Sequence, residues 1–208
     1  MTRLDDSLSS TIHPFERMKA RRWLSVALGA TIVGFSLGLG YVALQGAFGW
    51  LSDLGAIAFA VALVPVALHL REEFRQRAPT ASASVLGIAL LGLSLLAVSG
   101  AGLAVLDMTS TTTTFPVLTF QHLGIFLQGA WMIGVGVVGL RVGPFRRKTS
   151  LAALLSGLGY AAGAPVSLYM GFDTPLFYLA FLVALSGFVT WALSLRKDLD
   201  PRGTTLAG

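Results

Sequence analysis

Four side chains able to do chemistry lie at the ends of long apolar runs: Ser52, Asp53, Asp107 and His122. Carboxylate and imidazole groups can bind a cation, share a proton or activate water. Their spacing matches no established metal-ligand, nucleophile or phosphate-binding motif. The chain has no Cys, which excludes thiolate chemistry and disulfides. The sequence therefore offers a candidate polar site without a recognisable reaction, and it predicts no cofactor.

The apolar runs that position these residues are long enough to cross a membrane. A hydrocarbon core about 30 Å thick needs about 20 helical residues, and 54% of the 208 residues are hydrophobic while 12% are charged. Six runs meet or approach that length: residues 24–44, 51–70, 83–106, 122–140, 151–170 and 176–195. The sequence thus predicts an all-α, polytopic membrane protein, with an N-terminal segment 1–22, a six-helix domain 23–195 and a tail 196–208.

The basic residues predict the orientation of these helices. All 15 Lys and Arg residues fall in four alternate polar segments, residues 1–22, 71–77, 141–148 and 196–202. Cytoplasmic loops carry an excess of Lys and Arg, so both termini are expected in the cytoplasm of a prokaryotic cell, with the protein in its cytoplasmic membrane. The net charge of +5 then reflects topology, and no nucleic-acid partner is expected.

Asp107 is the least easily explained of the candidate residues. It is expected at the C-terminal end of the third helix, where the helix dipole disfavours an anion. The expected outer segments contain no Lys or Arg, so His122, at the expected start of the fourth helix, is the available positive group. We predict that Asp107 contacts His122 and that Ser52 and Asp53 join them.

A purely structural interpretation of these residues stays open. Ser52-Asp53 and Asp173-Thr174-Pro175 both have the composition of a helix start, where acidic and hydroxyl side chains cap free N–H groups. Asp107 and His122 could equally be solvated helix ends. His69, beside Arg71 at the expected cytoplasmic end of the second helix, needs no special role.

An internal duplication is suggested when the chain is compared with itself at an offset of 100 residues. Pro65 then matches Pro165 within similar apolar runs. Three helices per half make equivalent helices run in opposite directions, so the pattern is typical of a 3+3 inverted repeat. Proline removes a backbone hydrogen bond inside a helix, so kinks are expected at both positions. Small residues four apart, Gly34 with Gly38 and Gly159 with Gly163, favour close helix packing within the bundle.

The stretch from Phe48 to Gly55, reading FGWLSDLG, resembles the aromatic-LSDLG signature of a prokaryotic six-helix membrane family. That family is catalogued as a domain of unknown function (number 998). An acidic residue ending the third helix and a histidine opening the fourth, here Asp107 and His122, agree with the resemblance. It implies the six-helix architecture and the outer polar cluster, and it implies no activity, substrate or partner.

Three functions fit the sequence. The first is a non-enzymatic bundle that binds a lipid or small apolar ligand, or a membrane partner, through the outer cluster. The second is a small inverted-repeat transporter whose second and fifth helices line the path, although Gln128 is the only strong hydrogen-bonding side chain well inside a run. The third is a metal-dependent membrane hydrolase using Asp53, Asp107 and His122. The lipid bilayer is the one partner that all three require.

Overall fold

A computed structural model describes residues 14–43, 49–109, 115–143, 145–171 and 174–200, and their regular structure is entirely α-helical. The helices are α1 (Pro14–Ala43), α2 (Gly49–Arg75), α3 (Pro79–Met108), α4 (Phe115–Val142), α5 (Arg147–Met170) and α6 (Pro175–Asp198). Five of them, α2 to α6, are long and apolar enough to cross a membrane. The predicted all-α transmembrane bundle is confirmed. The sixth span, expected at 24–44, and the placement of both termini stay predictions.

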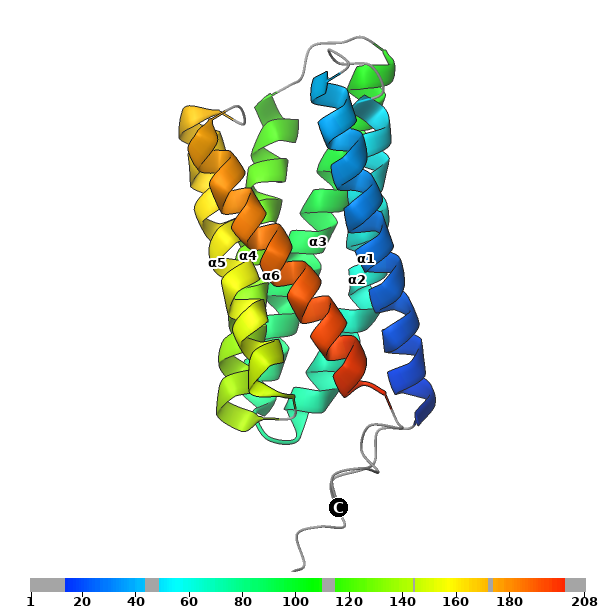
Figure 1. Cartoon of the computed structure of the whole chain (residues 1–208), viewed down its shortest axis with the longest axis vertical. Coiled ribbons are helices and arrows are strands. Elements are labelled where there is room, and N and C mark those ends of the chain that lie inside the picture. Colours follow the sequence, from blue (N-terminus) through cyan, green and yellow to red (C-terminus); the bar gives the residue numbers. More distant parts are fainter. Residues whose placement is uncertain (1–13, 44–48, 110–114, 144, 172–173, 201–208) are drawn as a thin grey trace, which may run out of the picture.

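Consecutive helices run in opposite directions and pack side by side, from α1 through α6 (Figure 1). The bundle closes through a smaller contact between α1 and α6. Figure 1 shows the reason, because α6 crosses the bundle obliquely from beside α5 to the end where α1 begins. Asp53 and Asp107 therefore belong to one end of the bundle, where α2 begins and α3 ends.

The helix boundaries differ from the predicted ones at two candidate residues. α2 begins at Gly49, so Ser52 and Asp53 lie within its first turns and do not start the helix. α4 begins at Phe115, so His122 lies two turns inside it and does not open it. The predicted cap before α6 is confirmed for Thr174, whose Oγ1 accepts a hydrogen bond from the Phe177 backbone N–H at 3.3 Å. Asp173 lies outside the described residues.

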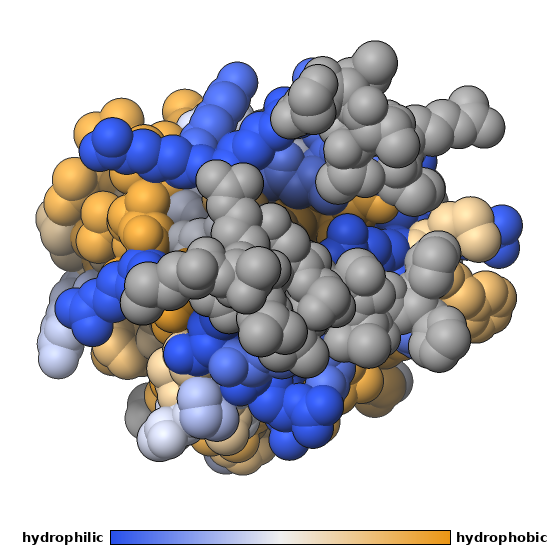
Figure 2. All heavy atoms as spheres, turned by 90° about the horizontal axis from the view of Figure 1, so that it is seen from below, coloured by the Kyte–Doolittle hydropathy of each residue, from blue (hydrophilic) through white to orange (hydrophobic). Residues whose placement is uncertain are grey.

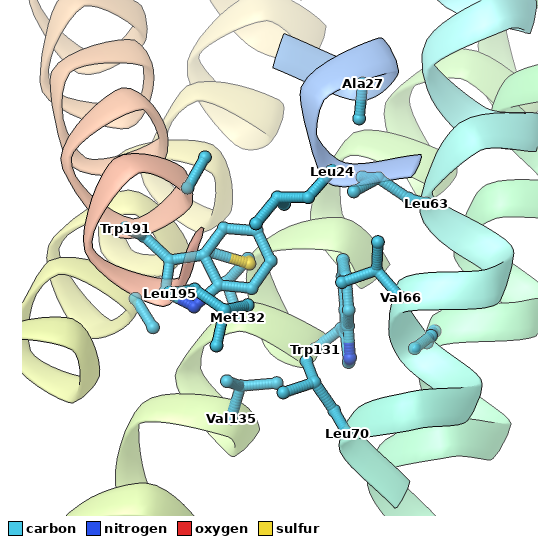
Figure 3. Close-up of a cluster of buried hydrophobic side chains, with 14 of the residues drawn as sticks. Leu24, Ala27, Leu63, Val66, Leu70, Trp131, Met132, Val135, Trp191 and Leu195 are labelled. Carbon is cyan, nitrogen blue, oxygen red and sulfur yellow. The ribbon is translucent and has the colours of Figure 1, made fainter. Parts of the chain in front are cut away.

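Buried apolar side chains concentrate in one half of the bundle, called here the packed half (Figure 3). It contains Leu24 of α1, Leu63 of α2, Trp131 of α4 and Trp191 of α6. The opposite half, called here the loose half, differs sharply. No residue of the stretches 50–59, 116–123 and 174–183 is buried, although these stretches begin α2, α4 and α6. In the same half α3 and α5 keep buried residues, such as Ala104 and Ala164, so the loosening described here is that of the beginnings of α2, α4 and α6.

A row of aromatic rings crosses the bundle interior between α2, α6 and α4. Phe59 meets Phe188 edge to face at 5.3 Å between ring centroids, Phe188 lies 5.5 Å from Trp191, and Trp191 lies 6.1 Å from Trp131. Edge-to-face rings gain attraction from opposite quadrupole regions. The row joins α2 and α6, which are not consecutive, through side chains alone.

Glycines bring the helix backbones together. A Cβ added at Gly129 of α4 would lie 2.6 Å from the Ala161 backbone nitrogen of α5, and one at Gly157 would lie 2.6 Å from the Ile133 nitrogen of α4. Only glycine permits so close an approach. Gly34 of α1 faces Gly55 of α2 in the same manner. The expected use of Gly34 within the bundle is confirmed, whereas Gly38 lies outside the residues whose contacts are described.

Polar groups close the end of the bundle opposite Asp53 and Asp107, called here the basic end. Figure 2 views this end and shows hydrophilic side chains across it, with apolar ones along the sides. Asp198 Oδ2 accepts hydrogen bonds from Thr149 Oγ1 at 2.7 Å and from the Arg146 backbone N–H at 3.2 Å, which joins α6 to α5. Arg77 Nη1 donates to the Val142 carbonyl at 2.6 Å. These bonds secure the ends of the helices.

Pro65 and Pro165 both lie inside unbroken helices, α2 and α5. Their equivalent placement is compatible with a duplicated unit. The bends at the two prolines and the 3+3 inverted repeat stay predictions.

Replacing Gly157 by Ala is expected to lower the free energy of unfolding by about 1–3 kcal/mol, because the added methyl group would force α4 and α5 apart. Gly87→Ala of α3 is the matched control, since no atom lies within 4 Å of its added Cβ. That control should leave stability unchanged or raise it by up to about 1 kcal/mol through helix propensity. Thermal unfolding in detergent micelles, followed by circular dichroism, measures both. Equal effects of the two substitutions would contradict this account of the packing.

Candidate functional site

Two carboxylates meet at the end of the bundle where α2 begins and α3 ends. Asp53 and Asp107 lie close enough for their like charges to interact, which places two negative groups from different helices in one region. Asp53 is partly buried and Asp107 is exposed. Gly100 lets α3 approach α2 closely near Asp53, because a Cβ there would lie 3.1 Å from the Asp53 carbonyl oxygen. Like charges repel unless a proton, a cation or a hydrogen-bond donor compensates them.

Ser52 belongs to the contact between α1 and α2 and does not cap α2. Its Oγ donates a hydrogen bond to the Gly34 carbonyl of α1 at 3.4 Å. A Cβ at Gly55 would lie 2.9 Å from the Cα of Gly34, so the two backbones touch beside this bond. Ser52 thereby fixes the start of α2, and with it Asp53, against α1.

His122 is half-buried in α4, and its Nδ1–H donates to the Leu118 carbonyl one turn earlier at 2.6 Å. That bond requires the Nδ1 proton, so the neutral ring carries its lone pair on Nε2. The hydrogen bond described for His122 is thus within its own helix. The predicted contact between Asp107 and His122 stays a prediction.

Metal binding lacks a ligand set here. Among the described residues, which include Asp53, Asp107 and His122, no three His, Asp or Glu side chains gather closely enough to hold a metal ion. A metal-dependent hydrolase that uses those three residues therefore has no structural support in this part of the chain.

Comparison with protein-family models, curated proteins and solved structures finds no match to this chain. The geometry alone therefore carries the functional argument. The resemblance of residues 48–55 to the six-helix family of unknown function stays a proposal.

A second polar cluster, at the basic end, was not predicted from the sequence. His69 was expected to be an interfacial residue with no special role, yet it is 7% exposed, and its Nε2 lies 3.4 Å from Glu73 Oε1. Arg17 of α1 lies 3.2 Å from the same Glu73 oxygen. The cluster therefore joins α1 to α2 through one carboxylate. The spacing of His69 and Glu73, four residues apart on one helix face, was the signal that could have indicated it.

Replacing Asp107 by Asn should raise the thermal midpoint by about 2 °C, because it removes the charge that repels Asp53 while keeping the side-chain shape. Glu72→Gln is the control, since Glu72 is a half-buried carboxylate 3.0 Å from Arg75 Nε. The control removes an attraction and should leave the midpoint unchanged or lower it slightly. Thermal unfolding near neutral pH measures both. A clear loss of stability in the Asp107 variant would show that the two carboxylates share a compensating group instead of repelling each other.

Proposed function

We propose that the chain is a six-helix protein of a prokaryotic cytoplasmic membrane, with both termini in the cytoplasm. It binds a lipid or small apolar ligand through a polar cluster at the outer face. Asp53 and Asp107 form the centre of this cluster, with Ser52 holding Asp53 in place and His122 nearby on α4. The protein is a binding component and performs no reaction of its own.

The meeting of Asp53 and Asp107 carries this proposal. Two carboxylates from different helices interact at one end of the bundle, and the connecting segments at that end contain no Lys or Arg. Such a pair favours a ligand head group that donates hydrogen bonds or carries positive charge. The early parts of α2, α4 and α6 at the same end contain no buried residue. Apolar chains of a ligand would find exposed apolar helix surface there.

A transporter is supported less well. Coupling sites of transporters usually contain ionisable groups near the middle of the membrane. Along the described helices, Asp53, His69 and Asp107 lie nearer to helix ends than to helix centres, and His122 lies about midway between the start and the centre of α4. The equivalent positions of Pro65 and Pro165 support an inverted-repeat transporter as the second candidate function.

Lipid carried through purification tests the binding proposal. The protein is extracted from native membranes in a mild detergent, and native mass spectrometry measures the lipid bound per chain. The double variant Asp53→Asn/Asp107→Asn should retain at least about fivefold less lipid, because charge-assisted hydrogen bonds to a head group contribute about 1.5–3 kcal/mol each.

The matched control is Glu16→Gln/Glu72→Gln, which removes one exposed and one half-buried carboxylate at the opposite end. It should retain lipid as the natural chain does. Equal retention by the two double variants, or no retained lipid in the natural chain, would rule out the proposed role of the aspartate pair.

Reporter fusions test the orientation. A reporter within residues 110–114 should be extracytoplasmic, and one at Arg146 should be cytoplasmic, because every Lys and Arg falls in alternate segments. Alkaline phosphatase, active outside, and green fluorescent protein, fluorescent inside, give opposite readouts at the two positions. Both positions on one side of the membrane would exclude the six-helix topology.

A further inference from the structure

Gln128 of α4 is a buried amide whose polar atoms are unpaired. Gln128 is 1% exposed, and neither its Oε1 nor its Nε2 has a hydrogen-bond partner among the described residues. Buried polar groups in folded proteins are almost always paired, so each exception calls for an explanation. An unpaired amide is costly to bury in an apolar interior, and a membrane span supplies no solvent to relieve it.

Gln128 lies deep in its helix, as do Trp131 Nε1 and Ser156 Oγ, which are also unpaired within the described part of the chain. It lies 12 residues after Pro116 in a span that ends at Val142, which corresponds to about 18 Å of helix from that end. Gln121, seven residues earlier, lies on the same face of α4 and is partly exposed. Two amides therefore follow one face from the loose half towards the middle of the bundle.

The surroundings of Gln128 differ on its two sides along α4. One turn further on lies Trp131, which is fully buried and belongs to the aromatic row with Trp191. Trp131 lies among Val66, Leu70 and Met132 of the packed half (Figure 3). On the other side, residues 116–123 of α4 contain no buried residue. Gln128 is thus the last polar group before the packed half begins.

The amide defines the chemistry of its partner. It presents N–H donors and a carbonyl acceptor side by side, so it pairs best with a group that both donates and accepts hydrogen bonds. No Lys or Arg occurs in residues 78–140 or 149–195, and Asp53 and Asp107 lie at the entrance end, so an anion has no compensating charge. A cation would leave the amide N–H groups unpaired. A neutral hydroxyl group satisfies both parts of the amide.

We propose that Gln128 binds the hydroxyl group of a neutral, long-chain lipophile that enters from the loose half, with the aromatic row at Trp131 as the floor of the site. This inference rests on the proposed function in that both place the ligand in the loose half. It adds the chemical class of the ligand and a second residue that recognises it, far along α4 from the aspartate pair.

Three probes with one chain length test the hydroxyl group: tetradecan-1-ol, its methyl ether and tetradecane. Native mass spectrometry of the full chain in detergent gives the dissociation constant of each. The alcohol should bind about three- to tenfold more tightly than the ether, which lacks the donor, and more tightly still than the alkane. In Gln128→Leu the three probes should bind alike. Gln76→Leu, which removes an exposed amide beyond α2, should keep the natural order.

Stability provides a second readout. Without ligand, Gln128→Leu should melt at a higher temperature than the natural chain, because it replaces an unpaired amide by an apolar group of similar size. A lower melting temperature would show that the amide is bonded within the bundle and would overturn the proposal. Gln128→Met carries the same tests if the leucine variant does not fold.

The two proposals fail separately. If the natural chain binds the three probes equally, the Gln128 amide does not bind a ligand hydroxyl group, and this inference is overturned. The role of the aspartate pair is then still tested by the lipid retention of its own variants. If the alcohol preference persists in Gln128→Leu but disappears in Asp53→Asn/Asp107→Asn, the hydroxyl site belongs to the aspartate pair, which also overturns it. Loss of the preference in Gln128→Leu alone, with native lipid still bound, supports it.

Discussion

Close contact between helix backbones is the constraint on which this bundle depends. In lipid, apolar side chains gain little by leaving one hydrocarbon environment for another, so association rests on van der Waals contact and on polar bonds between helices. Gly129 and Gly157 bring α4 within backbone contact of α5, and Gly34 and Gly55 do the same for α1 and α2. These contacts set the positions of the helix ends, and the helix ends carry Ser52, Asp53 and Asp107.

The two ends of the molecule differ in how their carboxylates are paired. At the basic end, Glu73 pairs with Arg17 and His69, and Asp198 binds Thr149 and Arg146, so both of these carboxylates have compensating partners. At the opposite end, Asp53 and Asp107 lie close enough for their like charges to interact. Carboxylates with compensating partners stabilise a fold, whereas carboxylates that repel each other are more typical of a ligand-binding site. This asymmetry favours the proposed ligand at the aspartate end.

Composition and run length predicted the fold class, because 20 apolar residues without charge have few alternatives to a membrane helix. The helix starts were less predictable. α2 begins at Gly49 and α4 begins at Phe115. Both helices therefore start before their apolar runs, in residues that hydropathy alone assigns to loops. The sequence placed Asp53 and Asp107 in one outer cluster, and their charges interact in the structure. The contact between Asp107 and His122 stays a prediction. The close approach of α3 to α2 at Gly100 was not predicted. Contacts between helices depend on rotation about their axes, which local pattern does not specify.

The uneven packing of the bundle also has a consequence for its motion. Local opening costs least where few apolar contacts are lost, so the beginnings of α2, α4 and α6 can separate while the packed half stays closed. The aromatic row from Phe59 to Trp131 lies at the boundary and would act as the pivot. The basic end then holds the helices together while the aspartate end opens. We therefore expect local opening to widen the bundle on the aspartate side while the bonds at the basic end stay intact.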